Sequence, residues 1–400
     1  MRYVVHCRVV EAIQPLRKDS SFSIAAIILT FITFLMIIGL KRGWLRFQAI
    51  AISLAMLMIF IVIGLLAIHT RADFIASFNA YSAKYASPDY NSVISIAKEQ
   101  GFNIPPTTLA STFGILPIAW WTFAYPYFSG VLGGEVKRVK TNALFSMFGS
   151  TLIAGICMIT ITWQMINVMG YDFLASISYI SGTTSYKLPA APYVHFLVGL
   201  LTNNVLVLSL IGIGFACWML PIAATSIIAV SRQMLAWSFD RLAPSFLGDV
   251  SDRYHTPVKN LILVLILSLG VLAVYTQFAT YFATFTATFL TVISWSLIAV
   301  SCIVLPFRKT TKPIYEASPA KYEIGKIPVI SLFGMGYLIY LAIMVYYYLN
   351  VPALGAINVP SAVIMIVAFV AGLIGFYVIR AYRRKQGIDI DLCYKSLPPE

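Results

Sequence analysis

Long apolar runs dominate the pattern of hydrophobic and polar positions along this chain. A run of about 20 apolar residues can cross the roughly 30 Å hydrocarbon core of a bilayer as a helix. Charged residues lie outside these runs or at their edges, whereas a soluble amphipathic helix would carry a charged face. The pattern predicts about nine transmembrane helices, at residues 21–40, 47–68, 107–133, 142–168, 194–230, 258–276, 283–305, 327–349 and 358–380.

Composition supports this interpretation. Hydrophobic residues make up 60% of the chain and charged residues 11%, and the mean hydropathy is +0.84. A charge at the centre of a membrane helix costs about 2.5–3.5 kcal/mol on insertion scales, so the exclusion of charges from the apolar runs argues that they are genuine spans. We therefore expect an all-α integral membrane protein, multi-pass in the cell membrane and surrounded by the lipid bilayer.

The net charge of +13 comes from basic residues whose positions indicate membrane topology. It does not indicate a nucleic-acid partner. Basic residues concentrate in alternate connections, which hold 20 of them against four in the opposite set. Because cytoplasmic loops carry the excess of Lys and Arg, we expect the C-terminus to be cytoplasmic and the N-terminus outside. Arg2, Arg8, Arg17 and Lys18 disagree with this topology, and residues 1–20 form an atypical N-terminal segment that does not resemble a signal peptide.

The run at 107–133 does not have the pattern of a simple lipid-facing helix. It carries Pro117 and Pro126, with further glycines toward its end. Proline has no N–H and clashes with the carbonyl four residues before it, so a break near Phe123 to Pro126 is predicted. Freed backbone groups are tolerated in a membrane only against other protein or water. A kinked but structural helix is the alternative.

Three connections are long enough to contain structure of their own. Residues 69–106 and 170–193 are predicted to be external and to carry short helices, with mobile loops as the alternative. Residues 231–257 are predicted to be cytoplasmic, with an interfacial helix that ends before Pro244 and a new helix that can begin at Pro257.

Catalytic and metal-binding patterns are missing from the sequence. The five cysteines are scattered, no His pair has metal-ligand spacing, and no HExxH or GxSxG motif occurs. Asp, Glu, Lys, Arg and His occur in the predicted spans only at their ends, so a proton-coupled mechanism has no visible carrier. We expect no enzyme activity, no metal and no cofactor. A membrane-embedded enzyme and a receptor-like membrane protein are weak alternatives.

Two segments resemble a known family. The stretch WWTFAYPYFSGVLGGEVKRVKTN at 120–142 is similar to the broken sixth span of amino-acid/polyamine/organocation (APC) superfamily permeases, and SRQMLAWSFDRLAPSFLGDVSDRYHTPVKN at 231–260 is similar to the loop after their eighth span. The resemblance extends from about residue 21 onward. It implies an inverted-repeat (5+5) fold in which broken first and sixth helices hold the substrate at mid-membrane.

In this register the chain corresponds to family helices 4–12 and lacks the first three transmembrane helices. The implied division has five parts: 1–20, the atypical N-terminal segment; 21–68, the last two helices of the first repeat; 107–305, a complete second five-helix repeat; 327–380, two C-terminal helices; and 381–400, a cytoplasmic tail.

The resemblance also implies candidate site residues. Trp121 matches an aromatic residue that closes over substrate in some members, and the residues that cover the unwound stretch are Phe123, Ala124, Tyr125, Pro126 and Tyr127. Two positions depart from the family pattern, because Tyr125 stands where glycine is usual and Tyr127 where an acid or amide is frequent. Substrate contacts at these two positions are therefore in doubt.

Hydroxyl side chains supply candidates for an ion site or a solute pathway. Thr225 and Ser226 match positions where related sodium-coupled folds bind the coupling ion, although hydroxyls in membrane helices also bond to their own backbone. Thr284 and Thr288 share a helical stripe with Thr291 and Trp295, which predicts either a pathway or plain helix packing.

These observations favour a secondary transporter that moves amino acids or related amines by alternating access. Its partners would be a small-molecule substrate, most simply an amino acid, and a coupling ion, H+ or Na+. The alternative in a different class is a truncated, non-transporting remnant or mis-started product of such a permease, because the broken span would have lost its partner helix.

Overall fold

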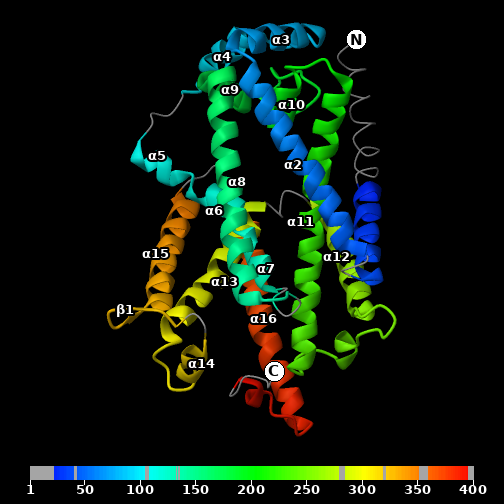
Figure 1. Cartoon of the computed structure of the whole chain (residues 1–400), viewed down its shortest axis with the longest axis vertical. Coiled ribbons are helices and arrows are strands. Elements are labelled where there is room, and N and C mark those ends of the chain that lie inside the picture. Colours follow the sequence, from blue (N-terminus) through cyan, green and yellow to red (C-terminus); the bar gives the residue numbers. More distant parts are fainter. Residues whose placement is uncertain are drawn as a thin grey trace. The chain divides into compact units, whose positions relative to one another are not determined.

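The computed structural model describes residues 22–39, 43–103, 108–131, 133, 136–278, 284–318, 321–350 and 359–394, and nearly all of its regular structure is helical (Figure 1). An apolar helix at Phe22–Ile38 comes first. The elements that follow are α2 Leu45–Ile68, α3 Arg71–Lys84, α4 Tyr90–Glu99, α5 Leu109–Gly114, α6 Leu116–Phe123, η2 Tyr125–Tyr127, α7 Phe128–Val131, α8 Val139–Met169, α9 Tyr171–Ile180, α10 Val194–Gly199, α11 Val205–Phe239, η4 Ser245–Gly248, α12 Val258–Phe278, α13 Thr284–Val304, α14 Lys312–Ala317, β1 Glu323–Ile324, β2 Ile327–Pro328, α15 Val329–Asn350, α16 Val359–Lys385 and η7 Ile390–Tyr394.

Within the described residues, six helices are long and apolar enough to cross a membrane. They lie in α2, α8, α11, α12, α15 and α16, and shorter apolar helices occur at Phe22–Ile38 and Thr291–Val304. Large apolar side chains on these helices are exposed, such as Phe145 at 75% and Phe333 at 74%. Soluble proteins rarely expose continuous apolar surface of this kind. The predicted all-α, multi-pass membrane architecture is confirmed.

One predicted span is wrong at its beginning. The run at 194–230 contains the short helix α10, a connection, and α11 from Val205 onward. Asn204 starts α11, because its side-chain oxygen accepts hydrogen bonds from the N–H groups of Leu206 at 2.9 Å and Val207 at 3.3 Å. An asparagine in this position satisfies N–H groups that have no partner within the helix. The hydrophobic pattern therefore predicted one continuous span where the structure has two helices.

The helix predicted within 231–257 ends before Pro244 as expected, but it is not a separate helix. Residues up to Phe239 continue α11, which is 35 residues long. The helix ends because Arg241 adopts a left-handed conformation with φ of 59°, and the N–H of Leu242 turns back to the carbonyl of Trp237 at 2.8 Å. Pro257 stands immediately before α12, as expected for the start of a new helix.

The chain forms two compact units, each made of segments that are distant in the sequence. Unit 1 contains residues 1–38, 112–125 and 227–400, and unit 2 contains residues 39–111 and 126–226.

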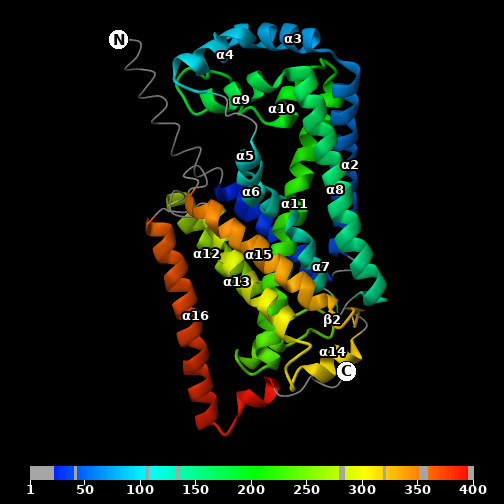
Figure 2. The same ribbon diagram turned by 90° about the vertical axis from the view of Figure 1, so that its left-hand side faces the viewer.

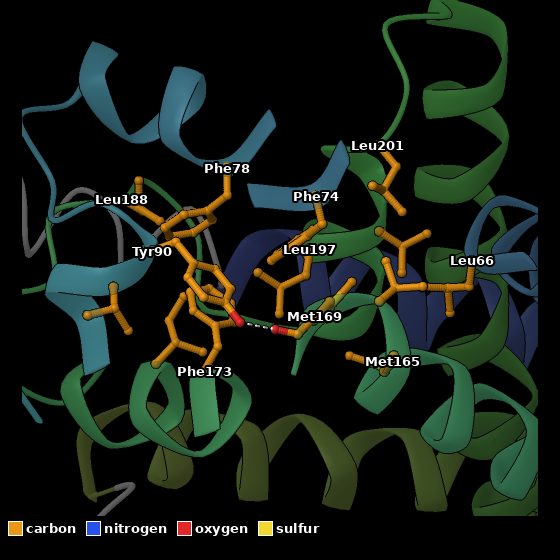
Figure 3. Packing of buried hydrophobic residues seen from close by; sticks show 14 of the residues in the cluster. Leu66, Phe74, Phe78, Tyr90, Met165, Met169, Phe173, Leu188, Leu197 and Leu201 are labelled. Carbon is orange, nitrogen blue, oxygen red and sulfur yellow. Dashed lines mark hydrogen bonds between the residues drawn. The ribbon is translucent and has the colours of Figure 1, made fainter. Parts of the chain in front are cut away.

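The short helices predicted in the two external connections are present in unit 2, as α3, α4 and α9. Together with α10 they lie across one end of α2 and α8 (Figures 1 and 2). Their core is aromatic (Figure 3). The rings of Tyr90 and Phe173 stack with centroids 4.5 Å apart, and Phe78 meets Phe173 edge-on at 4.9 Å. Such pairs contribute about 0.5–1.5 kcal/mol beyond the area they bury.

Polar contacts attach this aromatic core to the end of α8. The hydroxyl of Tyr90 donates to the carbonyl of Met169 at 2.8 Å (Figure 3). The guanidinium of Arg71 donates to the carbonyls of Ile166 and Asn167 at 3.1 Å. The last carbonyls of a helix have no partner within it, and cations are favourable there. Residues of α3 and α4 therefore complete the end of α8.

A capping box begins α3 beside this contact. Thr70 accepts from the backbone N–H of Asp73, and the carboxylate of Asp73 accepts from the backbone N–H of Thr70 at 2.7 Å. Hydrogen bonds from Thr70 lower the pKa of Asp73 below its ordinary value. The cap therefore keeps its charged form above the ordinary pKa of a carboxyl and loses it as the pH falls through the lowered pKa.

In unit 1, α13 and α15 lie side by side (Figure 2). Gly334 permits their close approach, since a Cβ there would lie 3.0 Å from the carbonyl oxygen of Ala299. Small residues serve this purpose between membrane helices. The hydroxyl of Ser331 also donates to the carbonyl of Ile303 at 3.0 Å.

Asn260 ties together three segments of unit 1. Its fully buried side-chain amide donates to the carbonyl of Ser231, in α11, and to that of Leu247, in η4, both at 3.1 Å. Thr256 extends this contact by donating to the carbonyl of Ile37 at 3.1 Å. The connection between α11 and α12 is therefore held by side-chain bonds to backbone.

We expect Gly170→Ala to destabilise unit 2. Gly170 has φ of +86°, and an added Cβ would lie 2.7 Å from the Tyr90 hydroxyl oxygen, so strain of about 1–3 kcal/mol should appear. The thermal unfolding midpoint of the purified protein should fall clearly. Tyr90→Phe alone should also lower the midpoint, because it removes the bond to Met169, but Gly170→Ala should cost less in the Tyr90→Phe background, where the close oxygen is absent. The control is Gly182→Ala in the same connection, where the nearest atom to a new Cβ is 3.9 Å away. Equal stability of Gly170→Ala and Gly182→Ala would contradict the strain.

Candidate functional site

The run at 107–133 is not one continuous helix. It consists of α5, α6, the single 3-10 turn η2 and the one-turn helix α7. The predicted break near Phe123 to Pro126 is confirmed, because α6 ends at Phe123 and η2 begins at Tyr125.

Two prolines explain where the helix is interrupted. Pro117 stands in the first turn of α6, so it has no N–H for the carbonyl of Phe113, and α5 ends at Gly114. Pro126 likewise has no N–H for the carbonyl of Thr122. Ala124 keeps helical angles, with φ of −73° and ψ of −25°. The interruption is therefore narrow and lies at the residues around Pro126.

Aromatic residues anchor α6 within unit 1. Trp120 is 7% exposed, and its indole N–H donates to the hydroxyl of Tyr337 at 3.3 Å. The ring of Trp295, on α13, meets Trp120 edge-on at 6.1 Å and lies 6.1 Å from Tyr337. Ala124 packs against the same cluster. The helix before the break is thus held against α13 and α15.

The residues predicted from the broken segment differ in environment. Trp121 is 38% exposed and meets the ring of Tyr125 edge-on at 5.9 Å. Phe123 and Ala124 are partly buried. In unit 2, the ring of Tyr127 stacks on Phe128 with centroids 4.3 Å apart. The boundary between the units falls after Tyr125, so Pro126 and Tyr127 belong to unit 2.

The model of a protein family described as amino acid permease matches residues 11–379. The chain belongs to the amino acid permease family. No curated protein and no solved structure gives a significant match. Membership identifies the permease as a transporter of amino acids or related compounds rather than an enzyme, and as a multi-pass protein of the lipid bilayer. The resemblance seen in the two sequence segments is confirmed.

The hydroxyl candidates of the permease lie on two helices. Thr225 donates to the carbonyl of Pro221 at 2.5 Å, and Ser226 to that of Ile222 at 2.9 Å. These bonds to their own helix match the alternative considered from the sequence, while both oxygens keep lone pairs. Thr284 and Thr288 stand on α13, and their side chains lie outside the described residues. Ion binding at all four stays a prediction.

The aromatic contacts that hold α6 against α13 and α15 could not be predicted from the sequence. Tyr337 and Tyr340 stack within an otherwise apolar run, with centroids 6.2 Å apart. Their aromatic spacing alone does not reveal which helix they contact. In the sequence Trp295 stands out only as part of a threonine stripe, whereas the structure places it against Trp120. In the part of the chain that is described, no cluster of three metal-ligating side chains occurs.

We expect Tyr337→Phe to destabilise the permease by about 1–3 kcal/mol, because it leaves the buried indole N–H of Trp120 without an acceptor. Thermal unfolding of the single variants Tyr337→Phe and Trp120→Phe and of the double variant measures the coupling between the two side chains. The double variant should lose less stability than the sum of the singles. Tyr346→Phe, on an exposed face of α15, is the control. Strict additivity would show that the hydrogen bond contributes nothing.

Proposed function

We propose that this permease moves amino acids or related amines across the cell membrane by alternating access and that the solute binds at the break after α6. The end of α6 at Phe123, with Pro126 three residues later, carries the proposal. A break in a spanning helix leaves polar backbone groups that need a partner inside the membrane. A solute with complementary polar groups can supply that partner.

The chemistry at the end of α6 suits an ammonium group. The carbonyl of Thr122 receives no N–H from Pro126, and the last carbonyls of a helix carry partial negative charge. The rings of Trp121 and Tyr125 lie beside this position, 5.9 Å apart. Aromatic faces attract cations within about 6 Å. An ammonium next to these carbonyls and rings is the part of the substrate that the site would recognise.

Gradient coupling belongs to the same proposal. Thr284 and Thr288, in unit 1, are candidates for a solute pathway. Thr225 and Ser226, in unit 2, are candidates for an ion site, with H+ or Na+ as the coupling ion and no other cofactor. Their oxygens are neutral ligands of the kind that hard cations accept. Comparing uptake under an imposed proton gradient with uptake under an imposed sodium gradient identifies the ion.

The proposed topology places the C-terminus in the cytoplasm. Contacts in unit 1 support it, because Arg383, in α16, donates to the carbonyls of Arg241 and Ala243 at 2.8 and 3.3 Å. These bonds join the C-terminal end of α16 to the connection that follows α11. Both segments belong to the basic set, and basic connections favour the cytoplasmic side.

Uptake of a labelled amino-acid panel into proteoliposomes, driven by a proton or sodium gradient, tests the function. We expect saturable uptake by the wild type and a fall of at least tenfold with Pro126→Ala. An alanine restores the N–H that can reach the Thr122 carbonyl, and removing proline from a helix is favourable by about 3 kcal/mol. The helix would then extend through the break.

Matched variants accompany this measurement. Pro313→Ala removes a proline from the first turn of α14 and should leave uptake unchanged. Trp121→Ala should lower uptake, whereas Trp163→Ala, which removes a tryptophan exposed on α8, should not. Absence of uptake across the whole panel under both gradients would overturn the proposed function, and full activity of Pro126→Ala would overturn the proposed place of binding.

The topology has its own test. In a variant whose five native cysteines are replaced by serine, Ser95→Cys in α4 should react with a membrane-impermeant maleimide on intact cells. Lys309→Cys, in the connection before α14, should react only after permeabilisation. Both positions are exposed, so access depends on the side of the membrane. The reverse labelling pattern would contradict a cytoplasmic C-terminus.

A further inference from the structure

A cavity of about 700 Å³ lies within unit 2, between α3, α10 and the first turns of α11. Its volume is within the roughly 300–1,000 Å³ of small-molecule sites. The lining residues of α3 recur at helical spacing, so one face of that helix borders the space. The hollow exists because small residues line it on all three sides: Ala76, Ala80, Gly199 and Gly212.

One wall of the cavity is apolar and ordered. The rings of Tyr81 and Phe196 meet edge-on with centroids 5.7 Å apart. Ile211, on α11, is 3% exposed and completes this wall. An aliphatic group could lie against these side chains and leave water, which is favourable by about 25 cal/mol per Å² of buried apolar surface.

The charges that line the cavity are basic. Lys84 and His195 border it, and no aspartate or glutamate does among the described residues. The ammonium of Lys84 has no carboxylate partner within the described part of the chain. Thr202 and Asn203 add neutral hydrogen-bonding groups. This set is complementary to an anion.

His195 has a defined orientation at the border of the cavity. Its ring stacks on Phe215 with centroids 3.8 Å apart. Burial lowers the pKa of His195 below its ordinary value, so the imidazole is neutral at neutral pH and can offer one N–H. Lys84 then supplies the full positive charge, and His195 a hydrogen bond.

We propose that this cavity is a binding site for a small solute that combines a carboxylate with an aliphatic part. Lys84 would attract the carboxylate, and Tyr81, Phe196 and Ile211 would contact the aliphatic part. The site is built by residues of unit 2 other than those of the broken segment. Its test is binding, which does not depend on the proposed transport.

Gly212 offers a direct way to fill the cavity. No atom lies within 4 Å of a Cβ built on Gly212, and a helical glycine replaced by a better helix former is tolerated or stabilised. Gly212→Leu therefore adds a larger side chain at the border of the cavity, and its Cβ meets no neighbour. Gly155→Leu, in α8, is the matched control, because it too has nothing within 4 Å and does not line the cavity.

The probe is isocaproate, and isocaproamide is its uncharged analogue. Saturation-transfer NMR on the full chain in phosphatidylcholine nanodiscs should show saturable isocaproate binding at least tenfold tighter than that of the amide. Lys84→Gln should weaken isocaproate about tenfold. Lys98→Gln, which removes an exposed charge from α4, should not change it. Gly212→Leu should abolish binding, and Gly155→Leu should retain it.

Three results would overturn the proposal. They are equal binding by wild type and Gly212→Leu, equal binding of the acid and the amide, and absence of isocaproate binding in phosphatidylcholine discs together with Lys84-dependent binding of phosphatidylserine. The last result would assign the cavity to a lipid head group. Loss of amino-acid uptake in proteoliposomes would leave this binding test intact, so the two proposals can fail separately.

Discussion

The need of every backbone polar group for a partner away from water governs this protein. In hydrocarbon a continuous helix satisfies nearly all of its own N–H and C=O groups, as α8 does over 31 residues. α11 runs for 35 residues, but Pro221 inside it has no N–H for the carbonyl of Cys217. The segment from Leu109 to Val131 departs from that rule, since Pro117 and Pro126 interrupt it. Such an interruption must be supported by its surroundings, and the aromatic contacts of Trp120 give α6 that support.

Helix ends also carry backbone N–H and C=O groups that need hydrogen-bond partners. Arg71 and Tyr90 donate to carbonyls at the end of α8, Asn204 accepts from the first N–H groups of α11, and Arg383 donates to carbonyls beyond its end. In each case a polar side chain from another segment or from the preceding residue replaces water. Within each unit these contacts join the ends of long helices to neighbouring segments.

How much could be predicted from the sequence depends on the range of the interaction. Apolar runs and prolines act locally, so the spans, the short external helices and the break at Phe123 to Pro126 were all predictable. The start of α11 was missed because Asn204 lies inside a long apolar run, where nothing in the sequence distinguishes it as an N-cap. A helix end before Pro244 was predicted, whereas the role of Arg241 in that end was not, because no glycine signals its left-handed conformation. The pair Trp120 and Tyr337 is separated by 217 positions, and no periodicity in one chain connects them. The cavity lined by Lys84 and Gly212 likewise arises from the packing of three helices.

Asn260 has a consequence for how the chain enters the bilayer. Its amide stands in the first turn of α12, and both carbonyls that it contacts belong to α11 and η4. A helix that carried this amide into lipid alone would have to desolvate it without compensation, at a cost of several kcal/mol per unsatisfied group. α11 and α12 are therefore more stable in a membrane as a hairpin than as separate helices, because the hairpin supplies the carbonyls that the amide of Asn260 needs.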